Sequence, residues 1–226
     1  MDIEINNVAS HEDFQEIELK LKLHDPQLVE SILKDSLIIK LSRGFRPLVK
    51  ENITTYYDTF DYRLLDNQVC YRIRNSAGEY TATIKGYGSS REGLSIRSEW
   101  NRKLSDNKPS LEPFIDLDIG QELERNIGKG DLLPIFTTRF KRTSLDLICE
   151  DGSVIELALD LGEIEADAKK EPISELELEL KSGHMENVLE LGNVLTQKYS
   201  LTPEDQSKYY RGLILVGLLN KISTGD

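Results

Sequence analysis

Two segments of the sequence place a charged residue at every second position. Residues 15–23 have the sequence QEIELKLKL, and residues 173–181 have the sequence ISELELELK. The alternating charged residues are Glu16, Glu18, Lys20 and Lys22 in the first segment and Glu175, Glu177, Glu179 and Lys181 in the second. A period of two is typical of a half-buried β-strand, because successive side chains point to opposite faces. Either these are solvated faces, or they are two walls of one charged interior.

Basic residues repeat with the same spacing in later segments. They are Arg72 and Arg74 in VCYRIR, Lys85 in YTATIKG, Arg97 beside Glu99 in LSIRSEW and Arg142 in TTRFKRT, while VIELALD adds Glu156 and Asp160. A solvated face explains any one of these strands. The strict repetition of glutamate and the change of sign between strands favour an interior.

Charges inside a protein must be paired or must bind something. A group of carboxylates repels itself unless cations occupy it, and an all-oxygen ligand set suits Mg²⁺ or Mn²⁺. A ring of arginine and lysine suits phosphate oxygens. Carboxylates, a divalent metal and a basic clamp together are the parts needed for phosphoryl transfer from a polyphosphate.

The elements that must position these residues are strands joined by short turns. We count about eight strands, with Asn75-Ser-Ala-Gly78 and Glu150-Asp-Gly-Ser153 as hairpin connections. Helices are expected at 26–39, behind Asp25 and Pro26, at 184–199 and at 204–220, with one short helix within 106–131. The pattern predicts an α+β protein built on an antiparallel barrel or sandwich. In the interior interpretation, the helices at 26–39, 184–199 and 204–220 cover the outward-facing leucines.

Composition limits the class of protein. The 226 residues suit one domain, predicted over 1–226, and the net charge of −12 argues against a broadly basic nucleic-acid surface. Cys70 and Cys149 are far apart and form neither a zinc motif nor a disulfide framework. No apolar run approaches a membrane span, and the first 14 residues lack the marks of a signal peptide. We therefore expect a cytoplasmic protein with no nucleic-acid or membrane partner.

Taken in order, these segments resemble the CYTH, or triphosphate tunnel metalloenzyme, superfamily. Glu16-Ile-Glu18-Leu-Lys20 matches its ExExK signature, and the matching segments that follow are YYDTFDYRLLDNQVCYRIR, TATIKG, RSEW, FTTRFKRT, IELALDLGEI, ISELELELKSG and DQSKYYRG. The last segment resembles the bacterial inorganic triphosphatase branch. ExExK alone is a weak signal, but eight such segments in order are a strong one.

The resemblance implies an eight-stranded antiparallel barrel that forms a tunnel and acts on a triphosphate with Mg²⁺ or Mn²⁺. The implied metal ligands are Glu16, Glu18, Asp160, Glu175 and Glu177, with Glu179 left open. The implied phosphate-binding residues are Lys20, Arg72, Arg74, Lys85, Arg142, Lys208 and Arg211. Glu16, Glu18, Lys20 and Asp160 are the expected catalytic residues, and Asp160 or another lumen carboxylate would deprotonate water. Arg97 and Glu99 are expected to form ion pairs inside the tunnel.

The substrate is the open question at this point. Inorganic tripolyphosphate is favoured, because no histidine or aromatic cluster indicates an adenine or thiazolium pocket. Class IV adenylate cyclase activity, thiamine triphosphatase activity and a non-catalytic polyphosphate-binding module are the alternatives. Some relatives pair as homodimers, but no feature of the sequence decides the oligomeric state.

Overall fold

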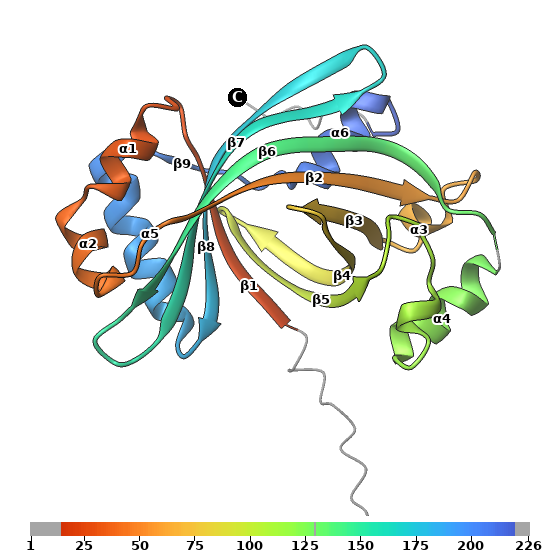
Figure 1. The fold of residues 1–226 in the computed structure, drawn as a ribbon, viewed down its shortest axis with the longest axis horizontal. Helices are drawn as coiled ribbons and strands as arrows, with labels where there is room; N and C mark the ends of the chain where they lie inside the picture. The colour runs from red at the N-terminus through yellow and green to blue at the C-terminus, as the bar shows by residue number, and fades with distance from the viewer. Residues whose placement is uncertain (1–14, 129, 220–226) are drawn as a thin grey trace, which may run out of the picture.

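In a computed structural model of the chain, the described residues are 15–128 and 130–219. One antiparallel sheet has the strand order β5-β4-β3-β2-β6-β7-β8-β1-β9, and an additional pairing of β5 with β1 closes it (Figure 1). The closed barrel consists of β1 (Gln15–Lys22), β2 (Leu48–Asp58), β3 (Cys70–Ser76), β4 (Glu79–Arg91), β5 (Leu94–Leu104), β6 (Leu133–Ile148), β7 (Val154–Ala166) and β8 (Lys169–Ser182). The short β9 (Thr202–Pro203) adds to the edge of β1. The predicted α+β fold with an eight-stranded antiparallel barrel is confirmed. The prediction of a single domain over 1–226 includes residues outside the described ones and stays a prediction.

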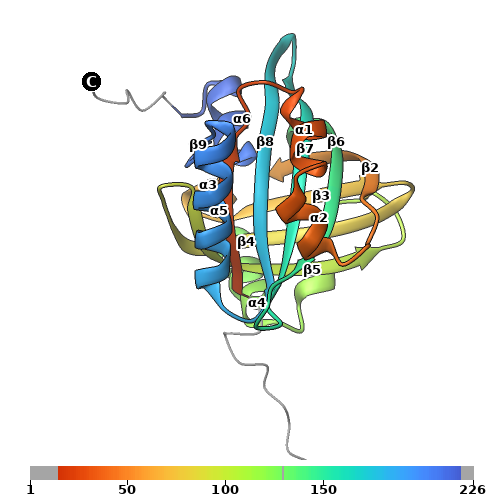
Figure 2. The same cartoon turned by 90° about the vertical axis from the view of Figure 1, so that its left-hand side faces the viewer.

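The charged faces of the strands point into the barrel, and the leucines point out. Leu19, Leu21, Leu176 and Leu178 are buried in one apolar cluster with side chains of the surrounding helices. These helices are α1 (Leu28–Leu33), α2 (Ser36–Ser42) and α5 (Met185–Tyr199), which lie side by side over one flank of the barrel (Figure 2). The interior interpretation of the charge alternation is therefore the correct one.

A second apolar cluster covers the outer face of the opposite flank. Tyr71, Ile73, Ile84 and Trp100 of the sheet are buried there together with Leu123 of α4. The covering elements are α3 (Arg63–Asp66), the 3₁₀ turn η2 (Glu112–Phe114) and α4 (Asp118–Ile127), drawn on the right of Figure 1. The short helix expected within 106–131 thus contributes to a core of its own.

The last helix, α6 (Lys208–Val216), does not cover outward-facing leucines as expected. Its Leu213 is buried with Tyr56, Phe136 and Phe140, which share the lumen parity of their strands. The approach is close, since a Cβ at Gly212 would lie 2.1 Å from the Phe136 ring. An amphipathic helix needs an apolar surface to cover, and the aromatic end of the lumen supplies one here.

The helix predicted over 26–39 is two short helices. Asp35 interrupts it in an extended conformation (ψ 133°), and its carboxylate accepts a hydrogen bond from the backbone N–H of Leu37 at 2.9 Å. Aspartate favours such a cap over a helix interior, so α2 begins anew after it. The helix predicted at 204–220 is described as Lys208–Val216, and its residue 220 lies outside the described residues. Within the described residues, no helix is long and apolar enough to cross a membrane.

Candidate active site

The lumen contains a cavity of about 360 Å³ whose walls carry both signs of charge. Its carboxylates are Glu16, Glu18, Glu99, Glu177, Glu179 and Asp205, and its cationic side chains are Lys20, Arg72, Arg74, Lys85, Arg97, Arg142 and Lys208. These side chains come from six strands of the barrel, the α5–α6 segment and α6. The strand register explains why they meet, because Lys20 lies opposite Glu177 and Lys85 opposite Glu99.

Two arginines of the cavity wall have buried nitrogen atoms without a partner. The Nε atoms of Arg72 and Arg74 are both buried and donate to no acceptor among the described residues. Burial and the neighbouring charges of Arg72 and Arg142 lower the pKa of Arg74 to about 10. A buried guanidinium with an N–H that lacks an acceptor favours an anion, so this wall fits phosphate oxygens.

On β4, the strand next to the β3 arginines, Lys85 lies between two carboxylates. Its Nζ is 2.7 Å from Oε2 of Glu16 and 2.5 Å from Oε2 of Glu99. Burial raises the pKa of Glu16 to about 7; Lys85 lowers it, but the negative charges of Glu18 and Glu99 add to the raising effect. Burial and the neighbouring carboxylates therefore outweigh the effect of the ammonium of Lys85 on the pKa of Glu16. Glu18 is 3.3 Å from the ammonium of Lys20.

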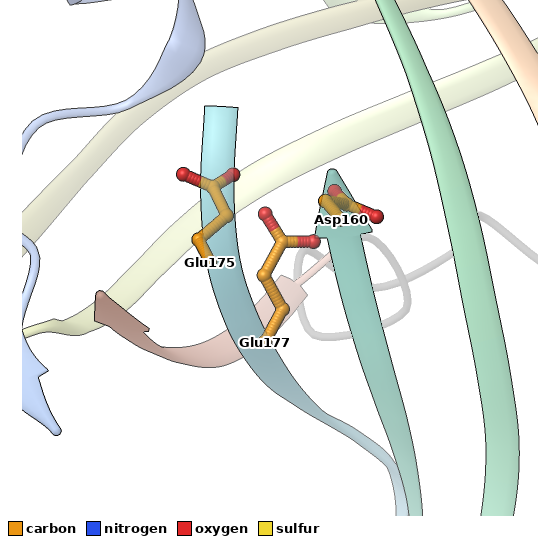
Figure 3. Close-up of side chains that lie close together, drawn as sticks. All are labelled: Asp160, Glu175 and Glu177. Carbon is orange, nitrogen blue, oxygen red and sulfur yellow. The ribbon is translucent and has the colours of Figure 1, made fainter. Parts of the chain in front are cut away.

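A second carboxylate cluster reaches the cavity wall at Glu177 and extends behind it. Asp160 on β7 and Glu175 and Glu177 on β8 offer oxygen atoms that all lie within 4.8 Å of one another (Figure 3). The ammonium of Lys208 contacts all three, at 2.8 Å from Asp160 and 2.8 Å from Glu177. Burial alone would lower the pKa of Lys208, but these carboxylates raise it well above its usual range. A protonated lysine therefore neutralises this cluster.

Two arginines complete the neutralisation of this cluster. Arg142 Nε donates to Asp160 at 2.7 Å, and the same guanidinium contacts Glu177. Arg211 contacts Glu171 at 2.7 Å and Glu175 at 3.4 Å. Asp160 and Glu175 are 0% and 1% exposed, and neither lines the cavity.

The donor set of the lumen fits a hard divalent cation. Its ligand atoms are carboxylate oxygens, which Mg²⁺ and Mn²⁺ prefer. Glu16 and Glu18 face the cavity, and Glu18 lies directly opposite Glu179 in the β1–β8 register. Both carboxylate groups of the lumen could hold a metal ion, but the second reaches the cavity only through Glu177.

The structure brings most of the predicted site residues to one cavity. Asp160, Glu175 and Arg211 are the exceptions, since they are buried behind its wall. The sequence interpretation left Glu179 open, although its parity equals that of Glu175 and Glu177 and it lines the cavity. The expected tunnel ion pairs are present, with Arg97 3.7 Å from Glu16 and Glu99 paired with Lys85. Asp205 at the cavity wall was missed, because no alternation marks a residue between elements.

The chain belongs to the CYTH domain family, whose profile matches residues 14–213. It is 34% identical over 211 residues to the inorganic triphosphatase of Haemophilus influenzae, a match that covers 89% of this chain and 55% of that protein. The chain thus spans about half the length of this curated relative.

Solved structures show the same fold. A putative adenylyl cyclase from Hippeastrum with a dominant triphosphatase activity superposes with a TM-score of 0.60 at 19% identity, over 87% of this chain and 95% of that one. A putative adenylate cyclase from Bacillus halodurans gives a TM-score of 0.51 at 17% identity, over 85% of this chain and 95% of that one. At these identities the comparison supports the barrel architecture alone.

Proposed function

We propose that this chain hydrolyses the terminal phosphoanhydride bond of inorganic tripolyphosphate in a reaction that depends on a divalent metal. The observation that carries the proposal is the cavity in which the unpaired guanidinium nitrogens of Arg72 and Arg74 share a lumen with the carboxylates of Glu16 and Glu18. The similarity to an inorganic triphosphatase supports the same substrate class.

Glu16 and Glu18 would hold the metal, Mg²⁺ or Mn²⁺, together with Glu177 or Glu179 of the neighbouring strand β8. When bound, the cation neutralises negative charge on the phosphate oxygens. The predicted ligands Asp160 and Glu175 would join this set only if the ammonium of Lys208 left their cluster.

The side chains of the chain itself bind and orient the substrate. Phosphate oxygens would be held by Lys20, Arg72, Arg74, Lys85 and Arg142, and Lys208 would contribute from α6. Water attacks the terminal phosphorus, the bridging P–O bond breaks, and diphosphate leaves with that oxygen. A lumen carboxylate accepts the proton of the water, and the fixed cations stabilise the charge that develops.

Two aromatic side chains of the cavity, Tyr56 and Tyr209, pack on other rings. Tyr56 stacks on Phe136 with a centroid distance of 4.5 Å and on Tyr209 at 5.7 Å. Phe136 and Tyr209 also stack on each other at 6.3 Å, so the three rings pack as one cluster, which supports an inorganic substrate over a nucleotide or thiamine triphosphate. A cytoplasmic location and the lack of a nucleic-acid partner stay predictions from the sequence, which leaves the oligomeric state open.

The test is the release of phosphate and of cyclic nucleotide from tripolyphosphate, ATP and thiamine triphosphate, each with Mg²⁺, Mn²⁺ or a chelator. Glu16→Ala is the test variant, and Glu163→Ala, on the outer face of β7 and paired with Lys170, is the matched control. Metal-dependent phosphate release from tripolyphosphate that is lost only in Glu16→Ala supports the proposal. Cyclic AMP from ATP would instead assign a cyclase, and tight polyphosphate binding without turnover would assign a binding module.

A further inference from the structure

Four side chains of β4 and β5 form a block on the lumen wall that is connected by two hydrogen bonds and one ion pair. In the strand register, Thr83 lies opposite Asn101 and Lys85 lies opposite Glu99. The hydroxyl of Thr83 donates to Oδ1 of Asn101 at 2.7 Å, and Nδ2 of Asn101 donates to Oε1 of Glu99 at 2.7 Å. The other oxygen of Glu99 is 2.5 Å from the ammonium of Lys85.

The donor and acceptor roles within the block are fixed, because each group can interact in only one way with its neighbour. Lys85 is ion-paired with Oε2 of Glu99, and an ionised carboxylate can only accept hydrogen bonds, so Asn101 must present its NH₂ group to Oε1. Its carbonyl oxygen then needs a donor on the other side, and the buried hydroxyl of Thr83 is that donor. The amide cannot turn over without placing its oxygen against a carboxylate.

Such a block can restrict the motion of Lys85, because the lysine side chain is flexible. An ammonium on a four-carbon stem has many rotamers, and a charge that moves stabilises a developing charge less well than a fixed one. Lys85 reaches three carboxylate oxygens, at 2.8 and 2.7 Å on Glu16 and 2.5 Å on Glu99. If Glu16 binds a metal, its hold on Lys85 weakens, and Glu99 becomes the anchor that remains.

We infer that Thr83 and Asn101 are positioning residues, which fix the carboxylate of Glu99 and, through it, hold the ammonium of Lys85 at the cavity wall. Neither residue needs to touch the substrate. The kinetic consequence rests on the proposed triphosphatase function, but the structural consequence for Lys85 does not.

The kinetic test is a double-mutant cycle with tripolyphosphate as substrate. Thr83→Val and Asn101→Ala should each lower kcat about tenfold with KM within about twofold, because many other cations still bind the substrate. The double variant should be no slower than Asn101→Ala, since both changes remove one connected chain of hydrogen bonds. Thr83→Ser, which keeps the hydroxyl, should restore wild-type kcat.

The matched control is Thr55→Val. It removes a cross-strand threonine contact of 3.2 Å, to Thr137, on the outer face of the barrel, and should leave kcat unchanged. Additive effects of Thr83→Val and Asn101→Ala, or a Thr83→Val variant with wild-type kcat, would overturn the inference.

A second measurement is independent of turnover. In protein labelled with ¹⁵N-lysine, the ammonium signal of Lys85 is assigned by its loss in Lys85→Arg. Asn101→Ala should broaden or shift this signal, while Thr55→Val should not. An unchanged Lys85 signal in Asn101→Ala overturns the inference, whatever the activity. If the wild-type chain shows no turnover but the signal responds as expected, the positioning role stands and the proposed function fails.

Discussion

The lumen holds two groups of carboxylates that differ in what neutralises them. Glu16 and Glu18 are paired with Lys85 and Lys20, which belong to the barrel wall itself. Asp160 and Glu175 are paired with Lys208 and Arg211 of α6, and Asp160 is also paired with Arg142 of β6.

The difference shows that strand parity alone does not make a residue available to a ligand. Both groups face inward, but α6 decides which of them is open. The barrel-paired group lines the cavity, whereas the α6-paired group is sealed, with Asp160 0% exposed. We infer that the first group serves the substrate and its metal, while the second holds α6 in place.

The largest effect that we expect from the difference between the two carboxylate groups is on the stability of the fold. Lys208→Met should lower the free energy of unfolding by about 3–5 kcal/mol, because it leaves three buried carboxylates without their shared cation. Urea denaturation in chelator measures it, and added Mn²⁺ should recover part of the loss by occupying the same carboxylates.

The control for Lys208→Met is Lys170→Met. Lys170 also contacts two carboxylates, Glu163 and Glu165, but on the outer surface. Its removal should scarcely move the urea midpoint. Equal losses in the two variants would contradict a special role for the buried cluster.

The next effect is on activity. Glu18→Gln should lower tripolyphosphate turnover by about 100-fold or more, because it removes one charge from the group that is open to the cavity. Stability should change little, since the only cation in contact with Glu18 is the nearby Lys20 at 3.3 Å in the described structure. Glu163→Gln on the outer face is the matched control. A Glu18→Gln variant with wild-type turnover would show that the carboxylate of Glu18 is not part of the active site.

Much of this arrangement could be predicted from alternation alone. The parity of QEIELKLKL and ISELELELK predicts that their carboxylates share one face, and the register then brings Glu18 opposite Glu179 and Lys20 opposite Glu177. The same pattern cannot rank Glu175, Glu177 and Glu179, because all three have one parity. The ranking depends on contacts between strands, which a single strand's sequence does not contain.

The position of α6 could not be predicted in the same way. Its pattern shows an apolar face but not which surface that face covers, and the lumen offers aromatic rings such as Phe136 and Phe140 as readily as the outside offers leucines. The prediction that Arg211 reaches the cavity is not supported for this reason. The start of α6 is defined locally, since the hydroxyl of Ser207 accepts the N–H of Tyr210 at 3.1 Å.

The open group should also give a pH dependence of stability in the absence of metal. Burial raises the pKa of Glu16 to about 7 from 4.5. Between these values the folded state binds a proton that the unfolded state has released, so stability falls as pH rises from about 4.5 to 7. The shift corresponds to about 3 kcal/mol.

Urea denaturation in chelator from pH 5 to pH 8 measures this effect as a difference between the wild type and Glu16→Gln. The wild type should lose stability relative to the variant as pH rises, and saturating Mg²⁺ should reduce the difference if the cation binds the ionised carboxylate. Parallel pH profiles without metal would show that Glu16 is ionised throughout and adequately paired by Lys85.

The smallest effect concerns the anion side of the same cavity. Arg74→Met should raise KM for tripolyphosphate about tenfold, the effect of one charge-assisted contact. It should not destabilise the fold, because the buried Nε of Arg74 has no protein partner and its guanidinium lies near Arg72 and Arg142. Arg139→Met, which removes an arginine paired with Glu165 on the outer face, is the control for KM. If Arg74→Met unfolds more readily than Arg139→Met, then Arg74 stabilises the barrel rather than binding the anion. The division of lumen residues into those that serve the substrate and those that stabilise the fold then fails at Arg74.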